Sequence, residues 1–360
     1  MSYDLYVSIP CEDQNAADGI AGGKINDIEI PNIYARIQLL APALRIEARW
    51  GRVKCKDYAH DKYRRLVFHF PDSAQTTYAT ELISKERAYM QQLGIWKPAS
   101  PDMGTLPPYS LFLQFQFTLA KPYLSRDDEI FYINENPVRK DKVFKIPMVA
   151  GTAWKGNLRW TATHLMVLRW HESHDVNQLA KERFRLTRLF GDEVGEVEGR
   201  NLAKYLDGLS QEAASRYRQL VREYFERTGN DPLPNHAGWL RFYPTSFDRI
   251  SLEVINPHDW QTRTGKHPIY FESVPIGATG TFSLLYVPLG AVDENLARAD
   301  LQTSAEAIRK MMRTYGFSAK KSSGFGEAED EISGKIVTAC DQKSLNTLSR
   351  LTDEVSHVRW

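Results

Sequence analysis

The sequence predicts an α+β fold, in which helices cover one face of an antiparallel sheet. Three observations favour this class of fold. A strongly alternating strand precedes a helix with an apolar stripe, several strands then follow one another, and a second helix precedes a last strand. The simplest arrangement with this order is the β-α-β-β-α-β, or ferredoxin-like, arrangement.

The composition is that of a globular protein with balanced charge. The 360 residues are 42% hydrophobic and 25% charged, which excludes a disordered chain. Lys and Arg number 46 against 45 Asp and Glu, so the formal net charge is +1. This balance excludes a protein held on nucleic acid by its overall charge. It leaves room for a locally basic groove, because a sum does not describe a distribution.

The sequence also indicates a cytoplasmic protein without a membrane partner. Cys11, Cys55 and Cys340 are far apart and form no CxxC pair, which argues against a cysteine zinc site or disulfide framework. Such sparse cysteines fit a reducing compartment. The first residues lack the charged and apolar regions of a signal peptide, and no run approaches the roughly 18 apolar residues of a membrane span.

We expect the N-terminal part to contain a loop, strands and one helix. Residues 1–30 are rich in Gly, Asp and Asn, which indicates a loosely packed arm. Strand-like runs lie between residues 32 and 70, and a helix is expected over residues 78–93. The proline-rich stretch 97–108 is the strongest linker signal. We therefore treat residues 1–108 as a strand-rich region that is either independent or an elaboration of the following domain.

Residues 109–340 are predicted to form the main domain, followed by a C-terminal tail over residues 341–360. In the run SLFLQFQFTLA an apolar residue occupies every second position from Leu111 to Leu119, which predicts a strand with one strongly apolar face. A polar loop and a short strand follow, and Thr152 is a plausible N-cap of the next helix.

The rest of this domain is expected to alternate between helices and strands. Two helices over about 175–190 and 200–228 enclose an acidic loop, residues 191–199. Three strands, a helix over about 297–315 and a last strand over 327–337 complete the order.

Residues 136–160 form the first segment with a functional pattern, because basic residues dominate it. Lys155 and Arg159 are four residues apart at the start of a helix, so they share one face. Cations at this end oppose the helix dipole, and an external phosphate would explain their position. The alternative interpretation is a solvated basic face. Arg139 and Lys140 precede this helix.

A second segment, residues 313–329, combines glycines with lysines and serines. Gly324 and Gly326 allow a close approach of the backbone, and their neighbours supply donors suited to phosphate oxygens. These neighbours are Lys320, Lys321, Ser322 and Ser323. The pattern matches neither dinucleotide nor phosphate-loop motifs, and the alternative is a flexible loop beside an edge strand.

A third segment, residues 45–65, interleaves basic residues with Trp50, Tyr58 and Tyr63. Positive charge with stackable rings suits single-stranded nucleic acid. Ordinary packing of a polar element explains the same pattern equally well.

The first two segments together resemble the RAMP superfamily, the repeat-associated proteins of CRISPR effector complexes. IPMVAGTAWKGNLRW is similar to the superfamily's signature, I-P-G-S-S-x-K-G-x-x-R, and GFSAKKSSGFG is similar to its glycine-rich loop. FRLTRLFGDE resembles the L-F-G segment that follows the signature helix. The resemblance covers about residues 109–337, and the stretch 254–285 is similar to Cmr-type subunits of type III complexes.

The resemblance implies an RRM-like, ferredoxin-like fold and a place in an RNA-guided ribonucleoprotein. Its partners would be crRNA, target RNA and other effector subunits, namely RAMP backbone proteins and the large signalling subunit. The guide supplies sequence recognition, so the protein reads backbone and shape. The implied RNA contacts are Arg139, Lys140, Lys155, Arg159, Trp154 and a second wall made by Lys320, Lys321, Ser322, Ser323, Gly324 and Gly326.

The sequence departs from the signature, because extra residues separate its proline from its glycine and Trp154 precedes the lysine. For Trp154 a core or base-stacking role is favoured over a catalytic one.

The main alternative to an RNA-binding subunit is an endoribonuclease that cleaves target RNA. Some type III backbone subunits carry an aspartate in a D-x-P-V-x-[KR]-[DE] pattern, where this sequence has Glu135. Asp127 and Asp128 lie in the same loop and are further candidates. No tightly bound cofactor is expected, and a divalent metal ion only if RNA is cleaved. A precursor-processing nuclease would need a histidine facing the glycine-rich loop, and sequence spacing identifies none.

Overall fold

The computed structural model describes residues 13–41, 52–68, 77–127, 136–191, 200–224, 237–256, 269–290 and 292–360, together with residues 9 and 11. Within these residues, five strands form one antiparallel sheet in the order β11-β10-β3-β9-β5. The strands are β3 (Leu111–Leu119), β5 (Leu240–Phe242), β9 (Thr279–Tyr286), β10 (Ala328–Val337) and β11 (Gln342–Thr347). The predicted mixture of helices with an antiparallel sheet is confirmed.

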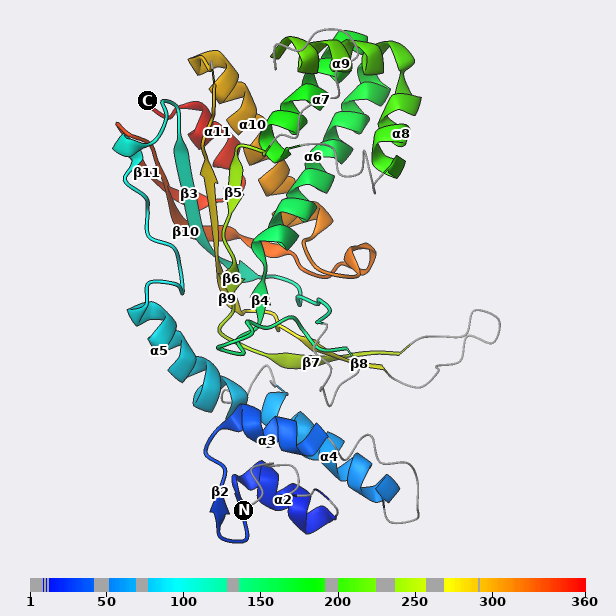
Figure 1. Cartoon of the computed structure of the whole chain (residues 1–360), viewed down its shortest axis with the longest axis vertical. Helices are drawn as coiled ribbons and strands as arrows, with labels where there is room; N and C mark the ends of the chain where they lie inside the picture. Colours follow the sequence, from blue (N-terminus) through cyan, green and yellow to red (C-terminus); the bar gives the residue numbers. More distant parts are fainter. Residues whose placement is uncertain are drawn as a thin grey trace.

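One face of this sheet packs on helices. The apolar side of β3 faces α6 (Gly151–Ser173), and Phe117 contacts the Trp154 ring at a centroid distance of 6.2 Å. The predicted stripe on α6 is confirmed, since Leu158, Ala162, Leu165 and Met166 are buried. Helix α10 (Glu294–Lys310) and the π-turn η4 (Met311–Tyr315) lie beside α6 and also border the sheet region (Figure 1).

The opposite face of the sheet is crossed by the proline-rich linker. The 3-10 turn η3 (Met103–Thr105) places Met103 against Phe112 of β3 and Leu285 of β9, in a small second apolar cluster. Farther along β3, the Gln114 side chain donates to the backbone oxygen of Pro98 at 2.8 Å. The linker is therefore held on the sheet by one apolar and one polar contact.

Additional helices pack at the end of the molecule opposite the N-terminus (Figure 1). They are α7 (Val176–Phe190), α8 (Arg200–Leu209) and α9 (Gln211–Tyr224), with α11 (Leu351–Ser356) against α10. The single helix expected over 200–228 is two helices separated at Ser210. Buried Asp300 on α10 accepts a 2.7 Å hydrogen bond from Arg188 of α7, which joins two helices of this end.

The described residues of the N-terminal part are mainly helical, so for these residues the strands predicted between 32 and 70 are wrong. It contains α2 (Gln14–Gly22), α3 (Ile33–Leu40), α4 (Arg52–Val67), the π-turn η2 (Ala79–Ile83), α5 (Ser84–Gln92) and the short hairpin β1 (Lys24–Ile25) and β2 (Ile28–Glu29). Asn32 caps α3 by accepting from the Ala35 N–H at 3.0 Å. Ile33, Ile37 and Leu40 then bury one helical face, a period that the β-branched residues disguised. The helix expected over 78–93 is confirmed as η2 and α5.

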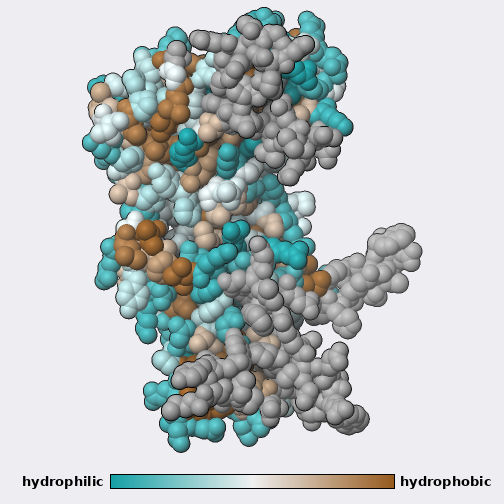
Figure 2. Space-filling model, in the orientation of Figure 1, coloured by the Kyte–Doolittle hydropathy of each residue, from teal (hydrophilic) through white to brown (hydrophobic). Residues whose placement is uncertain are grey.

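The end of α5 leads into the linker beside the sheet (Figure 1). Leu93 and Ile95 are exposed there, at 65% and 48% of their surface. The space-filling view shows an apolar cluster at this level, surrounded by hydrophilic residues (Figure 2). No described helix is long and apolar enough to cross a membrane.

Residues 341–360, expected to be a tail, contribute to the folded core instead. Strand β11 pairs with β10, with Gly334 opposite Leu345, and extends the sheet beyond the strand predicted to be last. Leu351 and Val355 of α11 are buried against the same core. The pattern in 342–347 is mostly polar because this strand forms the edge of the sheet.

Candidate nucleic-acid interface

Helix α6 begins at a close approach between two backbone segments. The short strand β4 (Met148–Val149) pairs with β6 (Thr245–Ser246) and delivers the chain to Gly151. A Cβ atom on Gly151 would lie 2.6 Å from the Phe242 carbonyl oxygen, so glycine is required. Ala150 is the N-cap residue, which corrects the predicted cap at Thr152. No described side chain caps this end, and helix N-termini of this kind favour anions.

Lys155 and Arg159 lie one turn apart on the N-terminal half of α6 and are both half-buried. The Arg159 guanidinium donates to the Gly191 carbonyl oxygen at 3.3 Å, at the end of α7. This contact brings the L-F-G segment against the helix that carries the two cations. The acidic loop 192–199 that follows Gly191 lies outside the described residues.

The glycine-rich loop docks on the same helix. Lys321 donates to the Asn157 side-chain oxygen at 3.1 Å and lies over the Trp160 ring at 4.2 Å. Asn157 in turn donates to the Phe317 carbonyl oxygen at 3.1 Å. Burial lowers the pKa of the Lys321 ammonium group below its usual value. Asn157 and Trp160 were not predicted as site residues. The one sequence signal for them is that they are three residues apart on the helix that carries Lys155.

Three positive-φ glycines set the path of this loop, namely Gly316, Gly324 and Gly326. At Gly326, with φ +73°, a Cβ atom would lie 2.3 Å from the Ser318 Cβ atom. Gly324 also has a positive φ, but a Cβ there would meet no described atom within 4 Å. Its surroundings are open, and Lys320, Ser322 and Ser323 beside it are exposed. The predicted second wall therefore presents accessible donors next to α6.

Lys140 is not an RNA contact, which corrects the prediction. Its side chain is only 2% exposed and forms an ion pair with buried Glu272 of β8 (Ile269–Ser273). The same carboxylate accepts from the Val138 N–H at 3.1 Å. Burial raises the pKa of the Glu272 carboxyl to about 8, and the Val138 N–H opposes that rise. Arg139, the neighbouring residue, is exposed, because the chain is extended here and alternates its side chains.

Trp154 is a core residue, so its predicted contact with RNA is wrong. The side chain is fully buried and its indole N–H donates to the Thr245 hydroxyl at 3.0 Å. Its ring contacts Phe282 edge-on at 5.1 Å. The core role that the sequence left open is the observed one, and an exposed aromatic ring is found instead at Trp160, 47% exposed.

The carboxylates considered for RNA cleavage are only partly described. Asp127 accepts from the Lys140 N–H at 3.1 Å, so it helps to hold the loop before α6. Asp128 and Glu135 lie outside the described residues. Among the described residues no group of three or more His, Cys, Asp or Glu side chains is arranged to hold a metal ion. The described part of the site thus offers cations and hydroxyls.

His164 contacts Tyr315, at the start of the segment that carries the glycine-rich loop. Its ring stacks on Trp160 at 5.3 Å and meets Tyr315 edge-on at 5.2 Å. These contacts describe a packed aromatic group beside Lys321. They explain why spacing alone did not identify this histidine, since Tyr315 comes from a distant segment.

The third basic segment forms part of helix α4 and serves packing. Tyr63 is buried and Arg64 stacks on the Tyr270 ring of β8 at 3.9 Å. Lys62 pairs with Asp18 of α2. Residues 45–51, including Trp50, lie outside the described residues. For the described part, the packing interpretation explains the pattern.

Comparison with known protein families identifies one matching family. The RAMP superfamily model matches residues 117–329, more than half of the sequence. The chain therefore belongs to the RAMP superfamily, which confirms the resemblance inferred from the signature, the L-F-G segment and the glycine-rich loop. No protein of curated function matches the sequence.

Several solved structures resemble this fold at low sequence identity. A chain of the type III-B Cmr-beta complex bound to cognate target RNA is 14% identical, with a TM-score of 0.40, and the match covers 80% of this chain and 75% of that chain. A chain of the Csm3–Csm4 subcomplex of the type III-A CRISPR–Cas interference complex is 11% identical, with a TM-score of 0.34 and coverages of 70% and 97%. A chain of a CRISPR RNA-guided surveillance complex is 11% identical, with a TM-score of 0.32 and coverages of 63% and 78%.

Proposed function

We propose that this protein is a crRNA-binding structural subunit of a type III CRISPR effector complex. The observation that carries the proposal is the contact of Lys321 with Asn157 and Trp160, which joins the glycine-rich loop to the signature helix α6. Two segments that are distant in the sequence thereby form one surface. That surface combines an uncapped helix N-terminus with cations and hydroxyl groups, a combination suited to a sugar-phosphate backbone.

The crRNA would lie along this surface. Lys155 and Arg159 on α6 form one wall, and Lys320 with Ser322 and Ser323 forms the other. The open surroundings of Gly324 allow a phosphate to approach the backbone. Arg139, exposed before α6, extends the positive charge. Because these contacts read phosphate and shape, sequence recognition is left to the guide by base pairing.

The topology supports a ferredoxin-like, RRM-like core as the platform for this surface. Without the insertions, the elements follow the order β3, α6, β5, β9, α10 and β10, and the strands lie in the order β10-β3-β9-β5. Both orders support the β-α-β-β-α-β arrangement. We infer that target RNA, further RAMP subunits and the large signalling subunit are its partners in the complex.

Affinity for RNA tests the proposal. In the assembled complex, Lys155→Ala with Arg159→Ala removes two phosphate contacts, so RNA affinity falls by about tenfold or more. The slope of log affinity against log salt falls by about 1.4 for single-stranded RNA. The matched control, Lys181→Ala with Lys204→Ala, removes two exposed cations of α7 and α8. Equal affinity and slope in the test variant and this control would refute the assignment.

A cleavage assay distinguishes a structural subunit from a nuclease. Guide-complementary RNA is incubated with Mg²⁺ and the wild-type complex, or with complexes carrying Glu135→Ala, Asp127→Ala or Asp128→Ala. If the proposal is right, the wild-type complex and the three variants form the same amount of cleavage product, or none. Loss of product in one variant, with RNA affinity retained, would assign cleavage to that carboxylate.

A further inference from the structure

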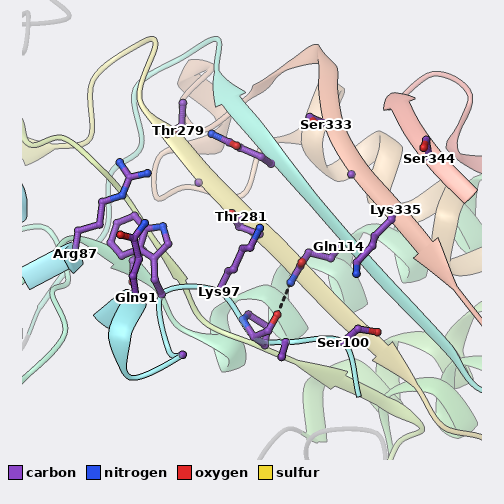
Figure 3. Close-up of a pocket in the computed structure, with 18 of the residues that line it drawn as sticks. Arg87, Gln91, Lys97, Ser100, Gln114, Thr279, Thr281, Ser333, Lys335 and Ser344 are labelled. Atoms are coloured by element: carbon purple, nitrogen blue, oxygen red, sulfur yellow. Dashed lines mark hydrogen bonds between the residues drawn. The ribbon is translucent and has the colours of Figure 1, made fainter. Parts of the chain in front are cut away.

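A second polar groove lies on the face of the sheet opposite α6. It has a volume of about 740 Å³ and runs between the end of α5, the linker and the surfaces of β3, β9, β10 and β11. Figure 3 shows its side chains in front of the sheet, with helices behind the strands. The groove is therefore separate from the surface formed by α6 and the glycine-rich loop.

The linker creates this groove by bridging the sheet. Its apolar part covers Phe112 and Leu285, while the adjoining positions of β3 on this face are Gln114 and Gln116. Gln114 donates to the Pro98 carbonyl oxygen at 2.8 Å and to the Ser283 hydroxyl at 3.0 Å. The first bond holds the linker on the sheet, and the second joins the Gln114 side chain to β9 and so fixes its orientation. The linker therefore keeps its position over the sheet, and the polar half of this sheet face stays open beneath it.

The charge of the lining is one-sided. Arg87, Lys97 and Lys335 contribute cations, and none of the described lining residues is Asp or Glu. The whole chain carries 46 basic and 45 acidic residues, so a lining without carboxylates departs from its average composition. Arg87 lies over the Trp96 ring at 5.0 Å, which orients its guanidinium at one end of the groove.

The remaining lining supplies neutral hydrogen-bonding groups. Figure 3 shows Gln114 between Lys97 and Lys335. Hydroxyl and amide groups surround them, namely those of Gln91, Ser100, Gln116, Thr281, Ser333, Gln342 and Ser344. Cations without counter-charges suit a phosphate, and amides with hydroxyls suit ribose and base edges.

We propose that this groove binds a ribonucleotide through its phosphate. The volume lies within the about 300–1,000 Å³ of sites for small ligands, so one or two nucleotides fit rather than a duplex. The ligand is either a free mononucleotide or the phosphorylated end of an RNA strand, which share this chemistry. The inference does not rest on the proposed crRNA contacts, because the groove lies on the other face of the sheet.

The experiment uses the full chain with two probes, UMP and a 5′-phosphorylated tetrauridylate. A tetrauridylate without the 5′-phosphate reports how far binding depends on that group. Affinities are measured for wild type and for Lys97→Ala with Lys335→Ala, with Lys181→Ala and Lys204→Ala as the matched control. Lys97 is exposed and Lys335 half-exposed, and thermal unfolding checks that the variant is folded. Crosslinking of a 4-thiouridine version of the tetranucleotide identifies the contacted peptide.

The groove variant is expected to lose affinity for the phosphorylated probes by about tenfold or more, while the control variant keeps it. The crosslink should map to residues 87–100 or 333–344. Binding of UMP as well as the tetranucleotide assigns a free nucleotide, and binding of the tetranucleotide alone assigns a strand end. Absence of binding by both probes overturns the proposal, as does unchanged affinity in the groove variant.

A further variant, Lys155→Ala with Arg159→Ala, separates the two sites. If it loses crRNA binding but keeps the crosslink at residues 87–100 or 333–344, both proposals stand. If it loses the crosslink at these residues, the groove is not a separate site. The experiment therefore gives different results if the crRNA assignment is wrong and if the groove proposal is wrong.

Discussion

The buried pair of Lys140 and Glu272 allows a prediction with a defined magnitude. Both side chains are 2% exposed, and the pair joins the segment before α6 to strand β8. Lys140→Met leaves the carboxyl buried without its cation. Burial raises the pKa of Glu272 from 4.5 to about 8 even though the Val138 N–H opposes the rise, and this net shift corresponds to about 5 kcal/mol. This agrees with the roughly 3–5 kcal/mol lost when one partner of a buried pair is removed.

The loss depends on pH in a defined direction. In the Lys140→Met variant the buried carboxyl has no cation beside it, so the folded chain keeps its proton to a higher pH than the unfolded chain, whose carboxyl has the ordinary pKa of 4.5. The variant is therefore relatively most stable below pH 4.5 and loses stability as the pH rises towards 8. In wild type the contacting ammonium group favours the carboxylate and opposes this loss. We expect little destabilisation at pH 5 and about 3–5 kcal/mol at pH 8, because only the ionised carboxylate misses its cation.

Urea unfolding of the full chain at both pH values measures these differences. Lys142→Met is the matched control, since Lys142 is exposed, and it should change stability by less than about 0.5 kcal/mol. The double variant Lys140→Met with Glu272→Gln should recover most of the loss at pH 8. It removes the charge and keeps an acceptor for the Val138 N–H. A loss for Lys140→Met that is the same at pH 5 and pH 8 would refute the reasoning.

Three further predictions concern packing and the two loops. Trp154→Ala removes a fully buried ring and should cost about 3–5 kcal/mol, seen as a lower melting temperature. Gly326→Ala should disrupt the glycine-rich loop and weaken RNA binding, because its Cβ would clash with Ser318, while Gly324→Ala, whose Cβ meets no described atom, should lower stability by only about 1–2 kcal/mol. Gln114→Leu removes the hydrogen bond to Pro98, so limited proteolysis should cut residues 94–106 faster than in wild type. An unchanged rate of cutting would contradict the role of Gln114 in holding the linker on the sheet.

The sequence predicted best those elements whose pattern is local. The alternation of residues 111–119 identified β3 and its buried face, and helix α6 followed from a stripe of period 3.6. Helix α3 was missed because Ile and Leu positions in a short apolar run satisfy both periods. The Asn32 cap was the signal that distinguishes them. Strand β11 was missed because an edge strand with one buried position carries little apolar pattern.

The sequence predicted which types of residue form the site, but it did not predict which of them are exposed. Arg139 and Lys140 are adjacent and equally basic, yet one is exposed and the other is buried. The difference arises from Glu272, which lies 132 residues away along the chain. In the same way, Trp154 and Trp160 share one helix, and only the position of the sheet decides that the first is core. Pairings of this range are set by the tertiary fold.

The contact that completes the proposed RNA surface has a consequence for synthesis of the chain. Lys321 and Asn157 are separated by 164 residues, and β10, which pairs with β3 at the centre of the sheet, follows the glycine-rich loop. A nascent chain that exposes α6 thus has only one wall of the surface until residues beyond 321 have left the ribosome. Capture of a guide would then be confined to chains whose central sheet is closed, so unfinished subunits would be kept out of assembly.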